Sequence, residues 1–243
     1  MNLASFFLLS ATVFAQLPPK HDLTVTLVNT PTVNTVKQMT TLVKVVGQVM
    51  DVSFDETHNA FSLRGFEHQL GLAEWLLHAA EKPPDSNEYV MQPDLRIDDR
   101  ALVTRVHYLN DSGRLNIQEI LTISRVMGIR LTEHLDQPAM IAFRGTASEA
   151  SLGDWLATNL DAPAGAGYKS FTVPSQGQGA DELVRIFFLD AATSPAKNHD
   201  MMNAIRQATG TNAVFNKTSP PAVVIRGTSA MISQAEQIVS HQP

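Results

Sequence analysis

The chain has 243 residues, 44% of them hydrophobic, which is enough for one large domain or several small ones with cores of their own. Its net charge of −6 at pH 7 opposes the phosphates of nucleic acids, so nucleic acid is not an expected partner. Because the sequence contains no cysteine, disulfides, thiolate metal sites and cysteine nucleophiles are excluded.

The N-terminal residues resemble a secretory signal peptide. An apolar stretch from Leu3 to Phe14 is followed by the small residue Ala15, at a position suited to cleavage. Positive charge before this stretch comes only from the α-amino group, and the stretch is shorter than the ~20 residues of a membrane-spanning helix. We therefore expect residues 1–20 to be a signal peptide or an apolar N-terminal segment, and the mature chain to have no membrane span.

An apolar strand that ends in Arg-Gly occurs three times, with spacings of 80 and 82 residues. The three pairs are Arg64-Gly65, Arg144-Gly145 and Arg226-Gly227. Another glycine precedes the glycine of each pair by 18, 17 and 17 residues. These earlier glycines are Gly47, Gly128 and Gly210. Landmarks that recur in one order three times indicate an internal repeat.

Each earlier glycine closes a predicted helix that begins at a capping residue. The capping residues recur every 82 positions, at Thr30, Ser112 and Ser194. In the first and third copies a proline follows the cap, and at the first helical position its missing N–H costs nothing. The glycine at the other end can adopt the left-handed conformation that ends a helix. The sequence thus predicts a helix between cap and glycine in every copy.

A hairpin and a second helix complete each copy. In the first copy a strand at 49–54, a turn at 55–59 and a strand at 60–63 follow Gly47. In the second copy residues 146–149 match a capping box that starts an amphipathic helix. Trp75 and Trp155 each lie ten residues after an Arg-Gly glycine, which favours the repeat core over a ligand site. The third copy has Gln237 there and a more polar helix, as terminal repeats often do.

Opening strands at residues 23–28, 102–109 and 183–189 complete the pattern. The sequence therefore predicts an α+β fold of three tandem β-α-β-β-α modules, each a three-stranded sheet with two helices on one face. We place the modules at residues 21–82, 101–161 and 183–243. A linker at 83–100 and a more flexible one at 162–182, rich in Gly, Ala, Ser and Gln, join them.

The repeat resembles the periplasmic N-terminal domains of bacterial secretins, the outer-membrane ring proteins of type II and type III secretion and type IV pilus systems. The third copy shows it best, with Val-Arg-Ile-Phe-Phe-Leu at 184–189 and Arg226-Gly227-Thr228 before a helix rich in Gln, Ala and Glu. Those domains share the β-α-β-β-α order. The resemblance covers residues 22–82, 101–162 and 183–243.

The resemblance implies a role in assembly. In that family such domains stack below the membrane channel, pack around a ring and dock other secretion or pilus components. A secretin also has a long C-terminal channel domain, which this sequence does not include, so we do not expect the chain to form a channel by itself. The implied protein is periplasmic, non-enzymatic and ring-forming, and it reaches the outer membrane through protein partners of a secretion or pilus machine.

The candidate site residues are Arg64, Arg144 and Arg226, because they are polar and share a repeat position. Two interpretations stay open. An arginine at a strand end can pair with a carboxylate or cap carbonyl groups, a structural role that contributes little at a surface. Alternatively, Arg144 and Arg226 face a neighbouring module, subunit or partner, since arginine is enriched at protein interfaces.

Three other kinds of chemistry have less support. Ser194-Pro-Ala-Lys197 matches the Ser-x-x-Lys pattern of penicillin-binding enzymes, but the companion motifs are absent and Ser194 aligns with the helix caps. The eight histidines include no His-x-x-x-His pair, so neither a metal nor a cofactor is predicted. The glycines after the first helices lack the Gly-x-x-Gly loop of KH-type RNA-binding domains.

The sequence therefore favours an exported interaction protein whose modules assemble with themselves or with a secretion or pilus machine. The alternative is a monomeric periplasmic binding protein for a peptide or a cell-envelope polymer. An enzyme ranks third, since no catalytic residue is predicted.

Overall fold

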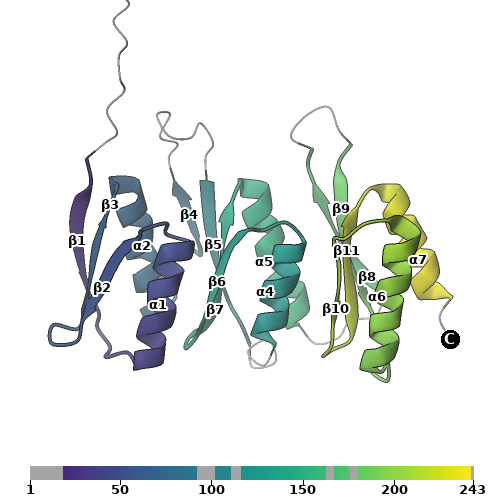
Figure 1. Ribbon diagram of the computed structural model, residues 1–243, viewed down its shortest axis with the longest axis horizontal. Coiled ribbons are helices and arrows are strands. Elements are labelled where there is room, and N and C mark those ends of the chain that lie inside the picture. The colour runs from purple at the N-terminus through teal and green to yellow at the C-terminus, as the bar shows by residue number, and fades with distance from the viewer. Residues whose placement is uncertain (1–18, 92–101, 111–115, 163–166, 176–179, 242–243) are drawn as a thin grey trace, which may run out of the picture.

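The computed structural model describes residues 19–91, 102–110, 116–162, 167–175 and 180–241. These residues contain six helices and eleven strands, and the strands form three antiparallel sheets. This confirms the predicted α+β class. Each sheet with its two helices is called a module from here on. Figure 1 shows the three modules in a row, from the purple N-terminal end to the yellow C-terminal end.

Module 1 has a three-stranded sheet in the order β1-β3-β2, with β3 in the middle. Its elements are β1 (His21–Thr26), α1 (Val33–Val45), β2 (Asp51–Asp55), β3 (Ala60–Gly65) and α2 (Glu67–Glu81). The strands β2 and β3 form the hairpin that the sequence predicted, with Phe54 opposite Phe61. Leu23 and Val52 flank Leu63 from the two sides, which directs apolar residues of all three strands to the helices.

Modules 2 and 3 repeat this arrangement and add a fourth strand. Module 2 consists of β4 (Glu88–Met91), β5 (Leu102–Tyr108), α4 (Ile117–Val126), β6 (Leu131–Asp136), β7 (Ala139–Gly145) and α5 (Ala147–Asp161). Module 3 consists of β8 (Tyr168–Val173), β9 (Glu182–Phe188), α6 (Pro195–Thr209), β10 (Val214–Lys217), β11 (Ala222–Gly227) and α7 (Ser229–Ser240). The sheet orders are β4-β5-β7-β6 and β10-β11-β9-β8.

The fourth strands β4 and β8 lie in segments that the sequence assigned to linkers. Each pairs antiparallel with the opening strand of its module, Glu88 with Arg105 and Ser170 with Arg185. Both are edge strands, and β4 has only four residues. A short edge strand shows little alternation between apolar and polar residues, so the surrounding prolines, aspartates and glycines dominated the sequence pattern.

The helix boundaries correct one predicted cap. The first helix starts at Val33, and Thr32, not Thr30, is its cap, since the Thr32 hydroxyl accepts a hydrogen bond from Thr35 N at 3.1 Å. Pro31 thus precedes the cap. Ser112 lies outside the described residues, and the N-cap of α4 is Asn116. Ser194 caps α6 as predicted, with Pro195 at the first helical position.

Two of the three predicted glycines end their helices in the expected conformation. Gly128 has φ of 104° and Gly210 has φ of 70°, values that favour glycine. After Gly47 the left-handed residue is instead Gln48, with φ of 58°. At the other end of α5, Thr146 and Glu149 form the predicted capping box, in which Glu149 accepts a hydrogen bond from Thr146 N at 2.8 Å.

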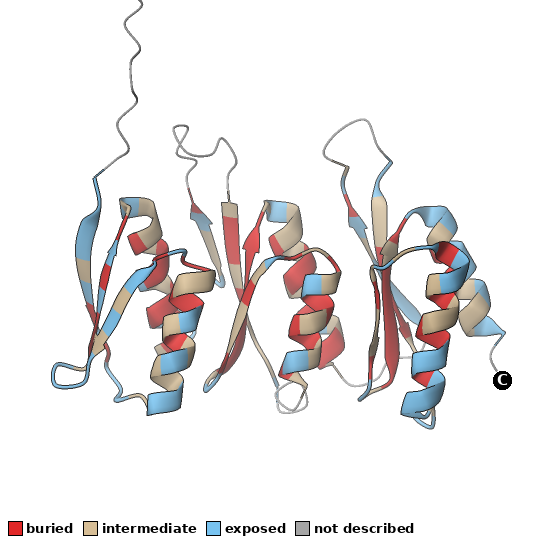
Figure 2. Cartoon of the chain, in the orientation of Figure 1, coloured by how far each residue is buried: buried red, intermediate tan, exposed pale blue. Residues whose placement is uncertain are grey.

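Modules 1 and 2 do not have cores of their own, because each shares its core with the sheet of the next module. One cluster of buried residues combines module 1 with Val106, Leu135 and Met140 of the second sheet. A second cluster combines module 2 with residues of the third sheet, among them Ile186 and Val224. Figure 2 shows the buried residues continuing through the middle of the row, while most residues of β1 and β2 in the first sheet are exposed or intermediate. The helices of modules 1 and 2 are therefore covered by a sheet on both sides.

No helix in the described part of the chain combines the length and the apolar character that crossing a membrane requires.

Gly153 of α5 tests how closely this helix packs on β7 of the same module. A Cβ at Gly153 would lie 2.4 Å from Cγ of Phe143, a fully buried ring of β7. We expect Gly153→Ala to lower the free energy of unfolding by about 1–3 kcal/mol through overpacking, although alanine is the better helix former. Gly71→Ala in α2 is the control, since its Cβ would meet only the movable Tyr89 hydroxyl. Urea unfolding of both variants measures the difference, and equal stability would contradict the close approach of α5 to β7.

Candidate functional site: the two module junctions

The three candidate arginines lie at equivalent strand ends but in different surroundings. Arg64 ends β3 on the outer face of the first sheet, where its side chain is 62% exposed and its Nε lies 3.8 Å from Asp22 Oδ1. Arg144 and Arg226 end β7 and β11, and both contact the module that precedes their own. We call the contact between modules 1 and 2 the first junction and the contact between modules 2 and 3 the second junction. Arg64 therefore lies on an exposed face, whereas Arg144 lies at the first junction and Arg226 at the second.

Arg144 closes the junction between modules 1 and 2. Its Nη1 donates a hydrogen bond of 2.6 Å to the carbonyl of Val46, the C-cap of α1, and the residue is only 3% exposed. Its Nη2 lies 3.4 Å from Sδ of Met91 in β4. The last carbonyls of a helix lack intrahelical partners and carry partial negative charge, which suits a guanidinium. The cost is desolvation, and burial lowers the pKa of Arg144.

Arg226 makes the same contact one repeat later. Its Nη1 donates to the carbonyl of Met127, the C-cap of α4, at 2.6 Å, and its Nε donates to Glu182 at 2.7 Å. Two features favour glycine at position 128, directly after Met127. Its φ is positive, and a Cβ added there would lie 2.5 Å from Arg226 Nη1. The arginine and the glycine, both repeat landmarks in the sequence, thus meet across the junction.

The two tryptophans also belong to the junctions. Trp75 of α2 contacts Tyr89 of β4, with ring centroids 5.6 Å apart, and Trp155 of α5 contacts Phe171 of β8 at 5.5 Å. Each fourth strand therefore places an aromatic ring on a tryptophan of the preceding module. This geometry explains why β4 and β8 are part of the stack and not loose connections.

Polar contacts at the edges of the first junction fix its register. Tyr108 donates a hydrogen bond of 2.7 Å to the carbonyl of Ala79 in α2, and burial raises the pKa of Tyr108 to about 12. Gln38 of α1 donates to Asp136 at 2.6 Å and accepts from Asp136 N at 3.2 Å. With Arg144, these contacts tie both helices of module 1 to the second sheet.

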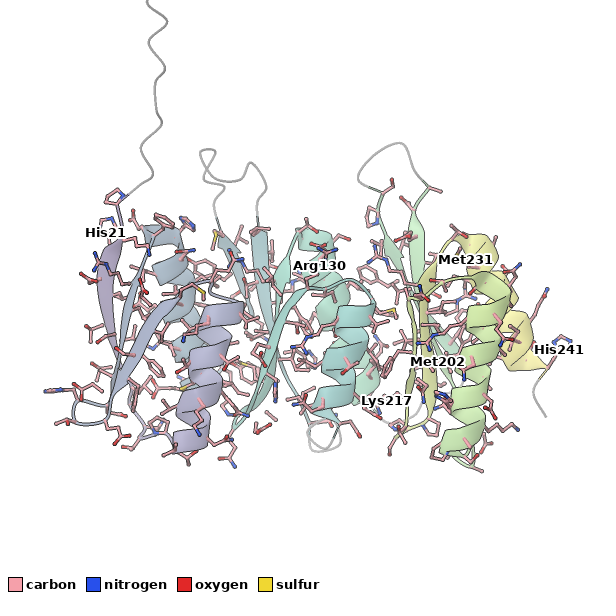
Figure 3. The ribbon with its side chains drawn as sticks, in the orientation of Figure 1. His21, Arg130, Met202, Lys217, Met231 and His241 are labelled. Carbon is pink, nitrogen blue, oxygen red and sulfur yellow. The ribbon has the colours of Figure 1, made fainter. Side chains whose placement is uncertain are left out.

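The second junction contains a buried lysine. Lys217 of β10 is 1% exposed, whereas the corresponding position in β6 is Leu135. Its ammonium donates to the carbonyl of Ser219, and Figure 3 labels it between the second and third modules. Burial lowers the pKa of Lys217 to about 8, against the opposing effect of Glu119 and Asp161. Glu119 also accepts a hydrogen bond of 2.6 Å from the Thr218 hydroxyl.

A second pair of arginines, missed by the sequence analysis, holds the fourth strands. Arg105 of β5 contacts Glu88 of β4 at 2.6 Å and Asp154 of α5 at 3.9 Å. Arg185 of β9 donates to Ser170 of β8 at 2.9 Å and contacts Glu236 of α7 at 2.7 Å. Leu23 occupies this position in module 1, whose described sheet has three strands. Aligning the opening strands on Arg-Gly would have revealed this pair.

The outer faces of the end modules are polar. In the first sheet the outward positions hold Asp22, Thr24, Thr26, Ser53 and Ser62, all exposed. The corresponding positions of the other sheets are mostly apolar and lie against helices, as with Val106, Tyr108 and Ala142 in module 2. At the other end, α7 has exposed Gln237 in place of the tryptophan. Polar outer faces are what terminal repeats need for solubility.

The motifs set aside on sequence grounds have structural explanations. The hydroxyl of Ser194 accepts a hydrogen bond from Lys197 N at 3.2 Å, so the Ser-x-x-Lys match is a helix cap. Among the described residues no group of three or more His, Asp or Glu side chains is arranged to hold a metal ion.

Comparison with solved structures gives weak likenesses to secretins. ExeD of Aeromonas hydrophila is 12% identical, with 91% of this chain and 40% of that chain covered and a TM-score of 0.21. GspD in the ETEC pilotin–secretin AspS–GspD complex is 10% identical (91% and 37% covered, TM-score 0.20). GspD of the E. coli K12 type II secretion system is 11% identical (91% and 38% covered, TM-score 0.20).

The chain spans about two fifths of the length of these proteins. TM-scores this low assign neither a family nor a function. No family model and no curated protein matches the sequence.

The buried arginine gives the first test of the junctions. We expect Arg144→Ala to lower the free energy of unfolding by about 1–3 kcal/mol, because the carbonyl of Val46 loses its buried partner. Arg64→Ala, at the equivalent exposed position, should stay within about 0.5 kcal/mol of the parent. Chemical denaturation measures both. Equal effects at the two positions would show that the helix cap contributes nothing.

The buried lysine gives a pH-dependent test. Since the pKa of Lys217 is lowered from 10.5 to about 8 in the folded chain, the unfolded chain binds more protons between these values. Stability from this group should therefore rise by about 2 kcal/mol from pH 7 to pH 9.5. Lys217→Met should be more stable than the parent at pH 7 and should lose this rise. Urea unfolding at both pH values measures it, and an unchanged pH dependence in the variant would refute the assignment.

Proposed function

We propose that the chain is a non-enzymatic, exported protein of the bacterial envelope that acts through protein–protein interaction. Its role resembles that of the N-terminal ring domains of secretins, as part of a secretion or type IV pilus system or as an accessory to one. Its partners are then proteins of that machine and further copies of itself, and it reaches the outer membrane through them.

The observation that carries this proposal is the repeated junction. Three small modules become one stack because each inner helix layer lies between two sheets and each junction has its own arginine cap. A stack of modules offers long side surfaces formed by helices and sheet edges, which suits contact with neighbours. The repeated Arg-Gly landmark and the closing pattern at 223–239 support the same role from the sequence.

The use of the arginines also supports a structural and not a catalytic protein. Arg144 and Arg226 donate to backbone carbonyls of the same chain, so their charges hold modules together. Arg64 remains the exposed member of the set, and contact of Arg64 with a subunit or partner is part of the proposal.

One feature favours the alternative, a monomeric periplasmic binding protein for a peptide or a cell-envelope polymer. A shallow depression of about 440 Å³ lies on the outer face of the first sheet, lined by Asp22, Asp51, Ser53, Ser62 and Arg64 among others. Polar side chains of both charges could bind an extended polar ligand there. The depression is open, however, and a specific ligand site normally encloses most of its ligand.

Sedimentation of the purified chain separates the two functions. Analytical ultracentrifugation over a wide concentration range should show a defined oligomer, a closed ring in the secretin-like case, and electron microscopy should show its symmetry. A monomer at every accessible concentration would support the binding protein instead. Arg64→Glu tests the exposed arginine in the same assay, because reversing a contact charge should weaken association while circular dichroism stays unchanged.

A further inference from the structure

Among residues 19–91, which the structure describes at this end of the chain, the first sheet has no counterpart of the fourth strand in the other two sheets. The fourth strands start at Glu88 and Tyr168, each 14 residues before the opening strand of its module at Leu102 and Glu182. The strand β1 corresponds to β5 and β9, yet within residues 19–91 only β3 pairs with it. One edge of β1 is therefore the counterpart of the edge that β4 and β8 cover.

The backbone groups at this edge can be identified by register. In module 2 the N–H of Val106 donates to Asn87 O at 2.9 Å, and in module 3 the N–H of Phe188 donates to Gly167 O at 3.0 Å, both on the fourth-strand side. Val106 corresponds to Thr24 and Phe188 corresponds to Thr26. The N–H groups of Thr24 and Thr26 therefore point out from the edge of the sheet, where carbonyl groups of an added strand could accept hydrogen bonds from them.

The sequence of β1 is complementary to itself in one antiparallel register. With Thr24 opposite Thr24 of a second copy, Asp22 lies opposite Thr26 and Leu23 lies opposite Val25. Asp22, Thr24 and Thr26 are exposed on the outer face of the sheet. Leu23 and Val25 face the helix layer and pack in the core of module 1. Apolar residues thus meet apolar ones over the helices, polar residues meet polar ones in solvent, and no like charges oppose each other.

We propose that β1 pairs with β1 of a second copy around a twofold axis at Thr24, which joins two first sheets into one of six strands. Such a contact is isologous, so it closes on itself and yields a dimer. It adds only one strand pair, a small contact compared with the ~1,200 Å² or more that stable interfaces bury, so we expect a weak dimer that dissociates on dilution. The inference names one partner for the proposed assembly function and in that respect rests on it.

The natural absence of cysteine allows a direct test by cross-linking. In a hydrogen-bonded antiparallel pair the opposed Cα atoms lie ~5.5 Å apart, within the range of a disulfide. Thr24→Cys should therefore give a covalent dimer under mild oxidation of the purified protein. Ser53→Cys is the matched control, because Ser53 is an exposed residue on the same face of the same sheet but on the strand β2. If Thr24→Cys gave no more dimer than Ser53→Cys, the proposed pairing would be wrong.

Two lysine substitutions test the register itself. Thr24→Lys places two ammonium groups opposite each other and should weaken the dimer measured by ultracentrifugation. Thr26→Lys adds the same charge two residues away, opposite Asp22, and should tighten the dimer about 2- to 10-fold, since each dimer contains two such pairs. Circular dichroism and melting show that both variants fold. Identical effects of the two substitutions would overturn the register, and with it the twofold axis at Thr24.

The experiment separates this inference from the proposed function. A protein that forms a ring but does not cross-link through Thr24→Cys has lost the β1 pairing and kept its assembly function. A protein that cross-links specifically and responds to the lysines as expected, but whose only oligomer is the dimer, keeps the pairing and loses the ring. An N-terminal segment that folded onto β1 within one chain would leave the Thr24→Cys variant monomeric, and would also overturn the pairing.

Discussion

The structure depends on one constraint. A sheet with helices on one face has a second face, and where that face is apolar it must be covered. In modules 2 and 3 that face lies on the helices of the preceding module, so the inner helices are buried from both sides. This explains residues that a single module would not need. Trp75 and Trp155 contact the next fourth strand. Arg144 extends back to the end of α1 because the close packing buries Val46, whose carbonyl group needs a hydrogen-bond donor.

Much of this fold follows from the sequence, because the repeat exposes it. The Arg-Gly landmark located the central strands, the glycines at 128 and 210 located helix ends, and the capping box at Thr146 located α5. The cap at Thr30 failed because two threonines flank Pro31 and either can start the helix, a choice that depends on the conformation of the chain before it. Propensity does not resolve a shift of two residues at a helix end.

The junctions were harder to predict, since their partners carry no side-chain signature. The sequence singled out Arg144 and Arg226 but left a structural role and an interface role open. Their acceptors are main-chain carbonyls of Val46 and Met127, which any residue could supply. The strands β4 and β8 were missed for a related reason, because they are held by backbone hydrogen bonds and because Tyr89 and Phe171 contact tryptophans of the preceding module.

The two junctions differ in a way that ranks their strength. At the first, Leu135 presents an apolar side chain to the helices of module 1, whereas at the second the corresponding residue is Lys217, whose ammonium is buried. Burying an ammonium costs several kcal/mol before its hydrogen bonds repay it, and a leucine carries no such cost. The hydrogen bonds of Lys217 to Ser219 and of Thr218 to Glu119 offset part of this cost. This position therefore stabilises the second junction less than Leu135 stabilises the first, so we expect the stack to open first between α4 and β10, and more readily as Lys217 takes up its proton.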